Sequence, residues 1–109
     1  MQAYDEIAGE NNPGACVHVN GGDLTECYKR EVNSQNQCRD YCSSQASCVG
    51  YDYNIEDKSY CRLFPTDNSC PIGFELYELN NAATAMTDLK RKKWDDMVCF
   101  GKKRGKIIL

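Results

Sequence analysis

The chain is 109 residues long, which fits one domain with short tails and leaves little room for a second. Only 41% of the residues are hydrophobic, so the core is expected to be small and another constraint must stabilise the fold. The formal net charge of -3 argues against a general binder of nucleic acid or of anionic membranes. No run reaches the roughly 18 apolar residues of a membrane span. The composition therefore predicts a soluble domain without membrane insertion.

Eight cysteines in so short a chain are typical of extracellular domains that replace missing core with disulfides. Metal binding needs close ligand pairs such as Cys-x-x-Cys, which do not occur here, and His18 is the only histidine. Residues Met1 to Ala15 lack the apolar segment of a signal peptide, so we interpret the chain as a mature protein with an added start Met. We expect a secreted, extracellular, disulfide-bonded protein with no metal and no other cofactor.

The first fifteen residues show no periodicity, and Asn11-Asn12-Pro13-Gly14 is a turn-forming run. Residues 1–15 are therefore predicted to be a flexible lead-in. Alternation from Cys16 to Val19 predicts a short strand, and Asn20-Gly21-Gly22-Asp23 predicts the tight loop that follows it.

A helix is predicted over residues 34–43. Ser34 is a favourable N-cap, and Gln37 stands three positions later, as in a capping box. Within this helix Cys38 and Cys42 are four residues apart, so both thiols emerge on one face. That face is expected to pack on the rest of the domain.

A hairpin should follow the helix. Residues 49–55 alternate, which predicts a strand with Val49, Tyr51, Tyr53 and Ile55 on one face. Residues 56–59 have turn chemistry, and residues 60–64 form the predicted return strand before Pro65.

The remaining chain carries weaker signals. A further strand is predicted over residues 74–79, and residues 81–93 are interpreted as a mobile insertion with weak helical character. Residues 97–100 predict a final strand, and residues 102–109 a basic C-terminal tail.

The central residues resemble the PAN/apple domain family. The resemblance is carried by the run Cys38-x-x-x-Cys42-x5-Cys48-Val49-Gly50-Tyr51-x-Tyr53-Asn54, followed by Tyr60-Cys61-Arg62-Leu63-Phe64, and it is strongest over residues 33–64. It implies an α+β fold: a small disulfide-rich domain over residues 16–101, with one helix packed on an antiparallel sheet.

Spacing alone allows 105 ways of pairing eight cysteines. The resemblance implies Cys38–Cys61 and Cys42–Cys48 as bridges between helix and sheet, and Cys16–Cys99 as the bridge between the first and last strands. This leaves Cys27–Cys70 as an additional pair.

No enzyme is predicted, because a lone His18 offers no partnered nucleophile or acid–base pair. The seven tyrosines favour recognition instead, since tyrosine combines a large apolar area with a hydroxyl group. Tyr51 is predicted to fill the core. Tyr53, Tyr77 and Trp94 are the candidates for a glycan platform or a protein hot spot.

Basic residues concentrate near the C-terminus, at Lys90, Arg91, Lys92, Lys93, Lys102, Lys103, Arg104 and Lys106. Three interpretations stay open for them. They are a solvated charged segment, a composite site for a polyanion such as a sulfated glycosaminoglycan, or a processing signal that trims the chain after Phe100.

The resemblance implies a binding function. Our first hypothesis is a secreted recognition module that binds an extracellular protein or a carbohydrate in cell adhesion or matrix contact. The alternative is a free diffusible effector, such as a toxin, pheromone or inhibitor, made of this one domain. The sequence leaves the oligomeric state open.

Overall fold

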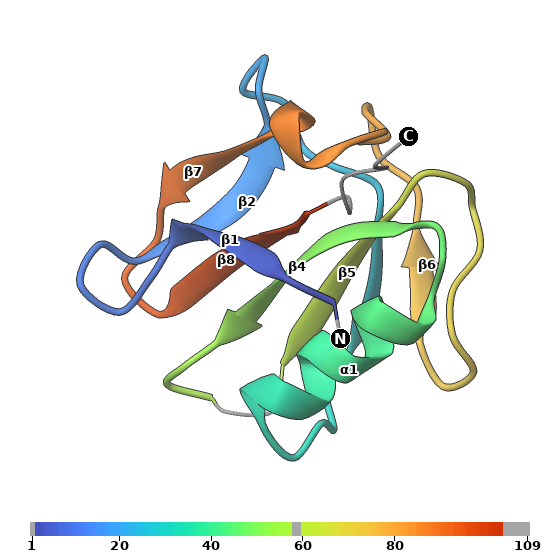
Figure 1. The fold of residues 1–109 in the computed structure, drawn as a ribbon, viewed down its shortest axis with the longest axis horizontal. Coiled ribbons are helices and arrows are strands. Elements are labelled where there is room, and N and C mark those ends of the chain that lie inside the picture. Colours follow the sequence, from blue (N-terminus) through green and yellow to red (C-terminus); the bar gives the residue numbers. More distant parts are fainter. Residues whose placement is uncertain (1, 58–59, 104–109) are drawn as a thin grey trace, which may run out of the picture.

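One helix packs against a six-stranded antiparallel sheet in the computed structural model (Figure 1), which describes residues 2–57 and 60–103. The sheet contains, in spatial order, β1 (Tyr4–Ala8), β8 (Met97–Lys102), β4 (Cys48–Asn54), β5 (Cys61–Pro65), β3 (Glu26–Lys29) and β6 (Glu75–Tyr77). A second sheet pairs β2 (Gly14–His18) with β7 (Leu89–Lys93). The predicted α+β fold class is confirmed.

Helix α1 (Gln35–Ser44) begins at the predicted cap. The Ser34 hydroxyl accepts a hydrogen bond from the Gln37 N–H at 3.1 Å, and the Gln37 side chain accepts one from the Asn33 N–H at 2.6 Å. These two bonds satisfy N–H groups that a helix leaves without a partner at its start. Cys38 and Cys42 are fully buried beneath the helix, as predicted.

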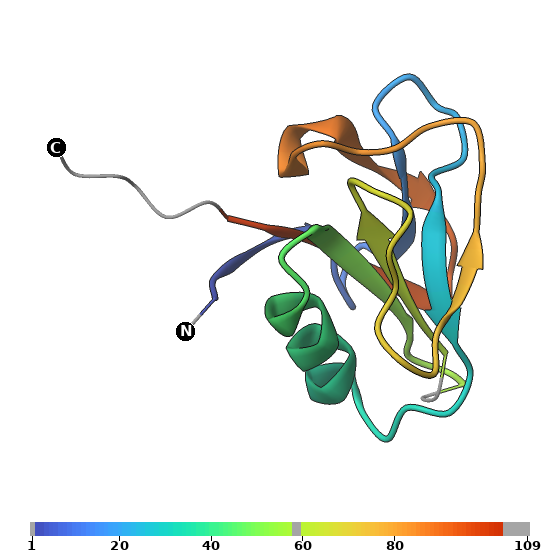
Figure 2. The same cartoon turned by 90° about the vertical axis from the view of Figure 1, so that its right-hand side faces the viewer.

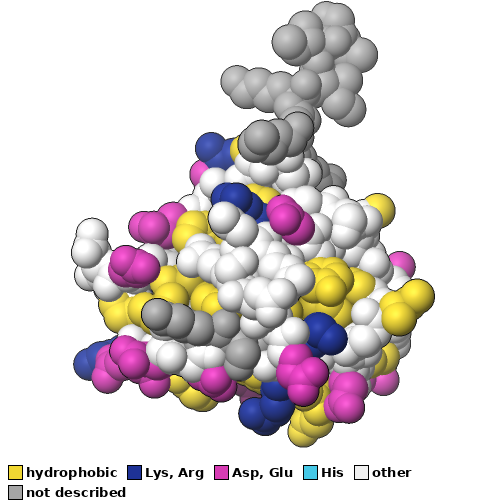
Figure 3. Space-filling view, turned by 90° about the horizontal axis from the view of Figure 1, so that it is seen from below, with side chains coloured by type: hydrophobic (Ala, Val, Ile, Leu, Met, Phe, Trp, Pro, Cys, Tyr) yellow, Lys and Arg dark blue, Asp and Glu magenta, His cyan; other side chains and the backbone are white. Residues whose placement is uncertain are grey.

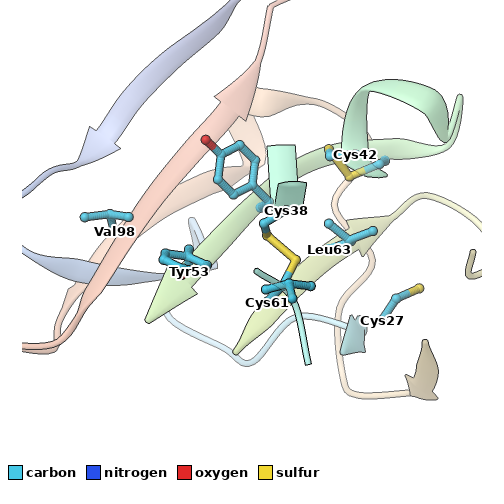
Figure 4. Packing of buried hydrophobic residues seen from close by; sticks show 10 residues of the cluster. Cys27, Cys38, Cys42, Tyr53, Cys61, Leu63 and Val98 are labelled. Atoms are coloured by element: carbon cyan, nitrogen blue, oxygen red, sulfur yellow. A yellow bond between two sulfur atoms is a disulfide. The ribbon is translucent and has the colours of Figure 1, made fainter. Parts of the chain in front are cut away.

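The core has two parts, one on each face of the large sheet. On the helix side, Tyr51, Tyr53, Leu63 and Val98 pack around the cysteines (Figure 4). Figure 2 shows the helix on one side of this sheet. On the opposite face, Phe64 packs in a second cluster with Val49, Leu89 and the Cys16 and Cys99 pair.

A bulge in β4 changes which side chains share a face. The register with β5 shifts between Cys48 and Tyr51, so Val49 joins the second cluster while Tyr51 and Tyr53 face the helix. The prediction that Val49 and Tyr51 lie on one face is therefore wrong. An extra residue in a strand reverses the alternation beyond it.

The prediction that residues 1–15 form a flexible lead-in is wrong as well. Residues 4–8 form β1, which pairs with β8 in the register Tyr4 to Lys102. The Tyr4 ring packs edge-on against Tyr51 at 5.3 Å between centroids, and its hydroxyl lies 2.8 Å from the Ser43 Oγ. Pairing with β8 and packing on the core therefore hold this segment, and neither constraint is visible in its local sequence.

The region predicted to be a mobile insertion, residues 81–93, is also ordered. It contains a short 3-10 helix, η1 (Met86–Asp88), and strand β7, whose five residues all pair with β2. Leu89 is buried in the second core cluster, while most of the basic side chains after it point to solvent. One buried residue and a partner strand are enough to place a segment whose composition looks like a loop.

The structure contains four disulfides, namely the three pairs that the resemblance implies and the pair that these three left over. They are Cys16–Cys99, Cys27–Cys70, Cys38–Cys61 and Cys42–Cys48. Cys38–Cys61 joins α1 to β5 (Figure 4). Cys16–Cys99 joins β2 of the small sheet to β8 of the large sheet, so it links the two sheets rather than the first and last strands.

Replacing Cys16 and Cys99 by alanine should lower the free energy of unfolding more than replacing Cys42 and Cys48. The first bridge closes 83 residues of chain and the second only 6, and restriction of the unfolded chain grows with loop length. We expect losses of about 4 to 5 and about 2 kcal/mol, respectively, in guanidinium unfolding. All four sulfurs are buried to a similar degree, so an equal loss would contradict this account.

Candidate ligand-binding cleft

A cleft of about 280 Å³ opens between the small sheet and the outer strands of the large sheet. Strands β2, β3, β5, β6 and β7 all contribute to it. The described lining residues are Ala15, Cys16, Val17, Asp23, Leu24, Glu26, Arg62, Phe64, Tyr77, Leu79, Lys92 and Trp94.

Strand alternation explains why this cleft has a polar floor. In β5, Cys61 and Leu63 belong to the helix-side core, so Arg62 between them points to the opposite face. In β3, Cys27 also belongs to that core, and its neighbour Glu26 points the other way. Two charged side chains thus lie together under the cleft.

The floor is organised by a buried ion pair. Asp52 of β4 is fully buried and lies directly opposite Arg62 in the register with β5. Arg62 donates through Nε to Asp52 Oδ1 at 2.7 Å and through Nη2 to Oδ2, a two-point geometry that favours tight pairing. Asp52 Oδ2 also accepts from the Cys16 N–H at 3.1 Å. One carboxylate therefore ties β2, β4 and β5 together.

Burial raises the pKa of Asp52, and the attraction of Arg62 and the hydrogen bond from Cys16 offset this only in part. For Arg62, burial is the largest single effect and lowers the pKa, but the charge and hydrogen bonds of Asp52 together with the charge of Glu26 outweigh it, so the pKa is raised. The guanidinium group therefore stays protonated. Its Cζ atom also lies 5.7 Å from the centre of the Phe64 ring, a contact that favours the charged guanidinium at this position.

Glu26 is the less satisfied member of this cluster. Its Oε2 atom is buried and has no hydrogen-bond partner among the described residues. The ion pair with Arg62 Nε is 3.4 Å long, and that nitrogen already donates to Asp52. Burial raises the pKa of Glu26, with Arg62 lowering it less than burial raises it.

Two of the predicted ligand-binding aromatics lie on this cleft. Tyr77 and Trp94 both line it, with 55% and 51% of their surfaces exposed. Tyr77 lies opposite Glu26 in the register between β3 and β6, which places it beside the polar floor. The prediction that Tyr53 is a third ligand-binding aromatic is wrong, because its side chain is buried in the helix-side core.

The residues of the predicted polyanion site differ in their surroundings, and several of them have partners within the fold. Lys90, Lys92 and Lys93 are exposed on β7, but Arg91 donates to the carbonyl oxygens of Asn12 and Pro13. Arg104 and Lys106 lie outside the described residues.

The other two basic candidates have structural partners. Lys102 belongs to β8 rather than to a tail, and its Nζ donates to the carbonyls of Cys42 and Gln45 at 2.9 and 3.1 Å. It thereby caps the C-terminus of α1, where a cation is favourable. Burial lowers the pKa of Lys102. Lys103 forms an ion pair with Asp5 at 2.9 Å.

On the face seen in Figure 3, acidic and basic side chains both occur. There, hydrophobic side chains form separate patches with acidic and basic side chains among them. Within residues 2–57 and 60–103, no group of three or more His, Cys, Asp or Glu side chains is placed to hold a metal ion. In that same part of the chain, no helix is long and apolar enough to cross a membrane.

Comparison with family models, curated proteins and solved structures finds no match. The resemblance to the PAN/apple family therefore stays a prediction that rests on the residues quoted above.

The difference in free energy of unfolding between Glu26→Gln and wild type should shift in favour of the variant as the pH rises from about 4 to 7. Because the pKa of Glu26 is raised in the folded state, protonated Glu26 contributes stability that is fully present below the usual pKa of about 4.3 and is lost as the pH rises through the raised pKa of the folded state. Denaturant unfolding at several pH values measures this difference. The exposed Glu10→Gln is the control, and a difference between Glu26→Gln and wild type that does not change with pH would refute the prediction.

Proposed function

We propose that the chain is a secreted, non-enzymatic recognition module of the PAN/apple type that binds carbohydrate in the cleft between Tyr77 and Trp94. The observation that carries this proposal is that two half-exposed aromatic side chains line the same cleft as a buried, charged floor. Four disulfides in the described chain are compatible with the oxidising compartment that such a role requires.

The two kinds of group suit the two kinds of surface on a sugar. The C–H faces of a sugar ring are apolar and can stack on aromatic rings, whereas its hydroxyl groups need hydrogen-bond partners. On the floor, Arg62 supplies N–H donors and Glu26 supplies a carboxylate group, of which Oε2 is buried. The volume of about 280 Å³ lies just below the range of about 300–1,000 Å³ that is typical of ligand sites, so the cleft suits a small ligand.

Binding fits this cleft better than catalysis. Arg62 is held in place by its two hydrogen bonds to Asp52, and Glu26 lies 3.4 Å from the Arg62 Nε. A reacting acid or base needs a substrate proton within reach and freedom to exchange it. The fixed Arg62–Asp52 pair, with the carboxylate of Glu26 beside it, instead offers a constant pattern of charges for recognition.

Tyr77→Ala and Trp94→Ala should each weaken binding to any ligand found on a glycan array by roughly ten-fold, since an aromatic contact contributes about 0.5 to 1.5 kcal/mol beyond its buried area. Both side chains are half exposed, so the fold should be kept. Ile72→Ala is the matched control, because Ile72 is fully exposed and does not line the cleft.

A wild-type protein that binds no glycan on the array would contradict the proposal, and so would glycan binding that neither aromatic substitution changes. Binding of a protein instead of a glycan, lost in the same two variants, would move the function to protein recognition at this cleft.

A further inference from the structure

The charges around the cleft are unbalanced. Among the described residues that line it or lie directly beneath its floor, three carboxylates, those of Asp23, Glu26 and Asp52, accompany two cations, Arg62 and Lys92. Arg62 and Asp52 neutralise each other through two hydrogen bonds. Glu26 and Asp23 are then opposed by Lys92 alone, so the cleft carries an excess of negative charge when these groups are ionised.

Glu26 is the source of this excess at the floor. Its nearest cation is the Arg62 Nε at 3.4 Å, and the N–H of that atom is already directed to Asp52. The buried Oε2 atom of Glu26 has no hydrogen-bond donor among the described residues. A carboxylate in such surroundings attracts a positive group strongly, because little solvent screens it.

The aromatic walls favour the same sign of charge. The faces of Tyr and Trp rings are electron-rich and attract cations, most strongly where water is excluded. Tyr77 lies opposite Glu26 in the strand register, so one wall of the cleft and its acidic floor are neighbours.

We infer that the cleft prefers a sugar that carries a free, protonated amino group over the same sugar in neutral, N-acetylated form. This inference rests on the proposed carbohydrate binding and adds the chemical class of the ligand. Glu26 is largely buried, so little water screens its charge. Its carboxylate therefore attracts the ammonium group of the sugar across the floor of the cleft as well as by direct contact. In the proposed complex, the amino group of the sugar lies close to the Tyr77 and Trp94 side chains.

The test compares the β-1,4-linked trimer of glucosamine with its fully N-acetylated counterpart by titration calorimetry. An amine with the pKa of an α-amino group, about 7.7, is largely protonated at pH 7, and the sugar amine belongs to this class of primary amines. Wild type should bind the amino trimer at least about five-fold more tightly, and added salt should reduce this preference.

Glu26→Gln should reduce the preference for the amino trimer to less than about two-fold. Asp23→Asn, on an exposed loop residue, should reduce it in part and serves as a second variant that does not touch the buried cluster. Glu10→Gln removes the same charge from an exposed site outside this cleft and should leave the preference unchanged.

Equal affinity for the two trimers, tighter binding of the acetylated trimer, or a preference that both Glu26→Gln and Asp23→Asn keep would overturn this inference. If neither trimer binds while other glycans do, the inference is overturned and the proposed function stands. If no glycan binds at all, the proposed function fails with it.

Discussion

A single buried carboxylate holds together the parts of this domain that form its cleft. Asp52 sits in the middle of β4, where it receives two hydrogen bonds from Arg62 of β5 and one from the Cys16 N–H of β2. The same residue of β2 also forms a covalent link, because the Cys16 side chain is joined by a disulfide to Cys99 of β8. The small sheet is therefore fixed to the large one at one residue by a polar contact and a disulfide.

Such a pair specifies structure more than it adds stability. Removing a carboxylate and a guanidinium from water costs several kcal/mol per ion, and their attraction returns this only where the geometry is good. An unpaired charge at this position would be strongly unfavourable, so packings that separate Asp52 from Arg62 are excluded. Glu26 carries the third charge and lies 3.4 Å from the Arg62 Nε, but that nitrogen donates its hydrogen bond to Asp52.

Local signals predicted the parts of the fold that depend on neighbours in sequence. The N-cap at Ser34 and the pair Cys38 and Cys42 located α1 and its buried face, and alternation located the hairpin of β4 and β5. Strands β1 and β7 depend on partners far away in sequence, and their own residues look like loops. The bulge in β4 likewise leaves no trace in the alternating pattern that it interrupts.

The aromatic part of the candidate site could be predicted, but its polar floor was missed. Tyr77 and Trp94 stand outside strong alternating patterns, which agrees with their exposure, whereas Tyr53 stands inside one and is buried. The pairing of Asp52 with Arg62 could not be read from the predicted hairpin. A turn at residues 56–59 would place Leu63 opposite Asp52, whereas the structure places Arg62 there. The contribution of β3 could not be inferred, because Glu26 reaches the floor only through the order of the strands.

Mapping of backbone and side-chain amide shifts by NMR tests most directly whether this cleft is the recognition surface. Trp94 is the only tryptophan, so its indole N–H gives one unambiguous signal at the cleft. On addition of the glucosamine trimer, the account predicts the largest shifts for that signal, the Arg62 Nε–H, and the amides of Glu26 and Tyr77. Shifts that cluster instead on α1 or on β1, with the Trp94 and Arg62 signals unchanged, would contradict it.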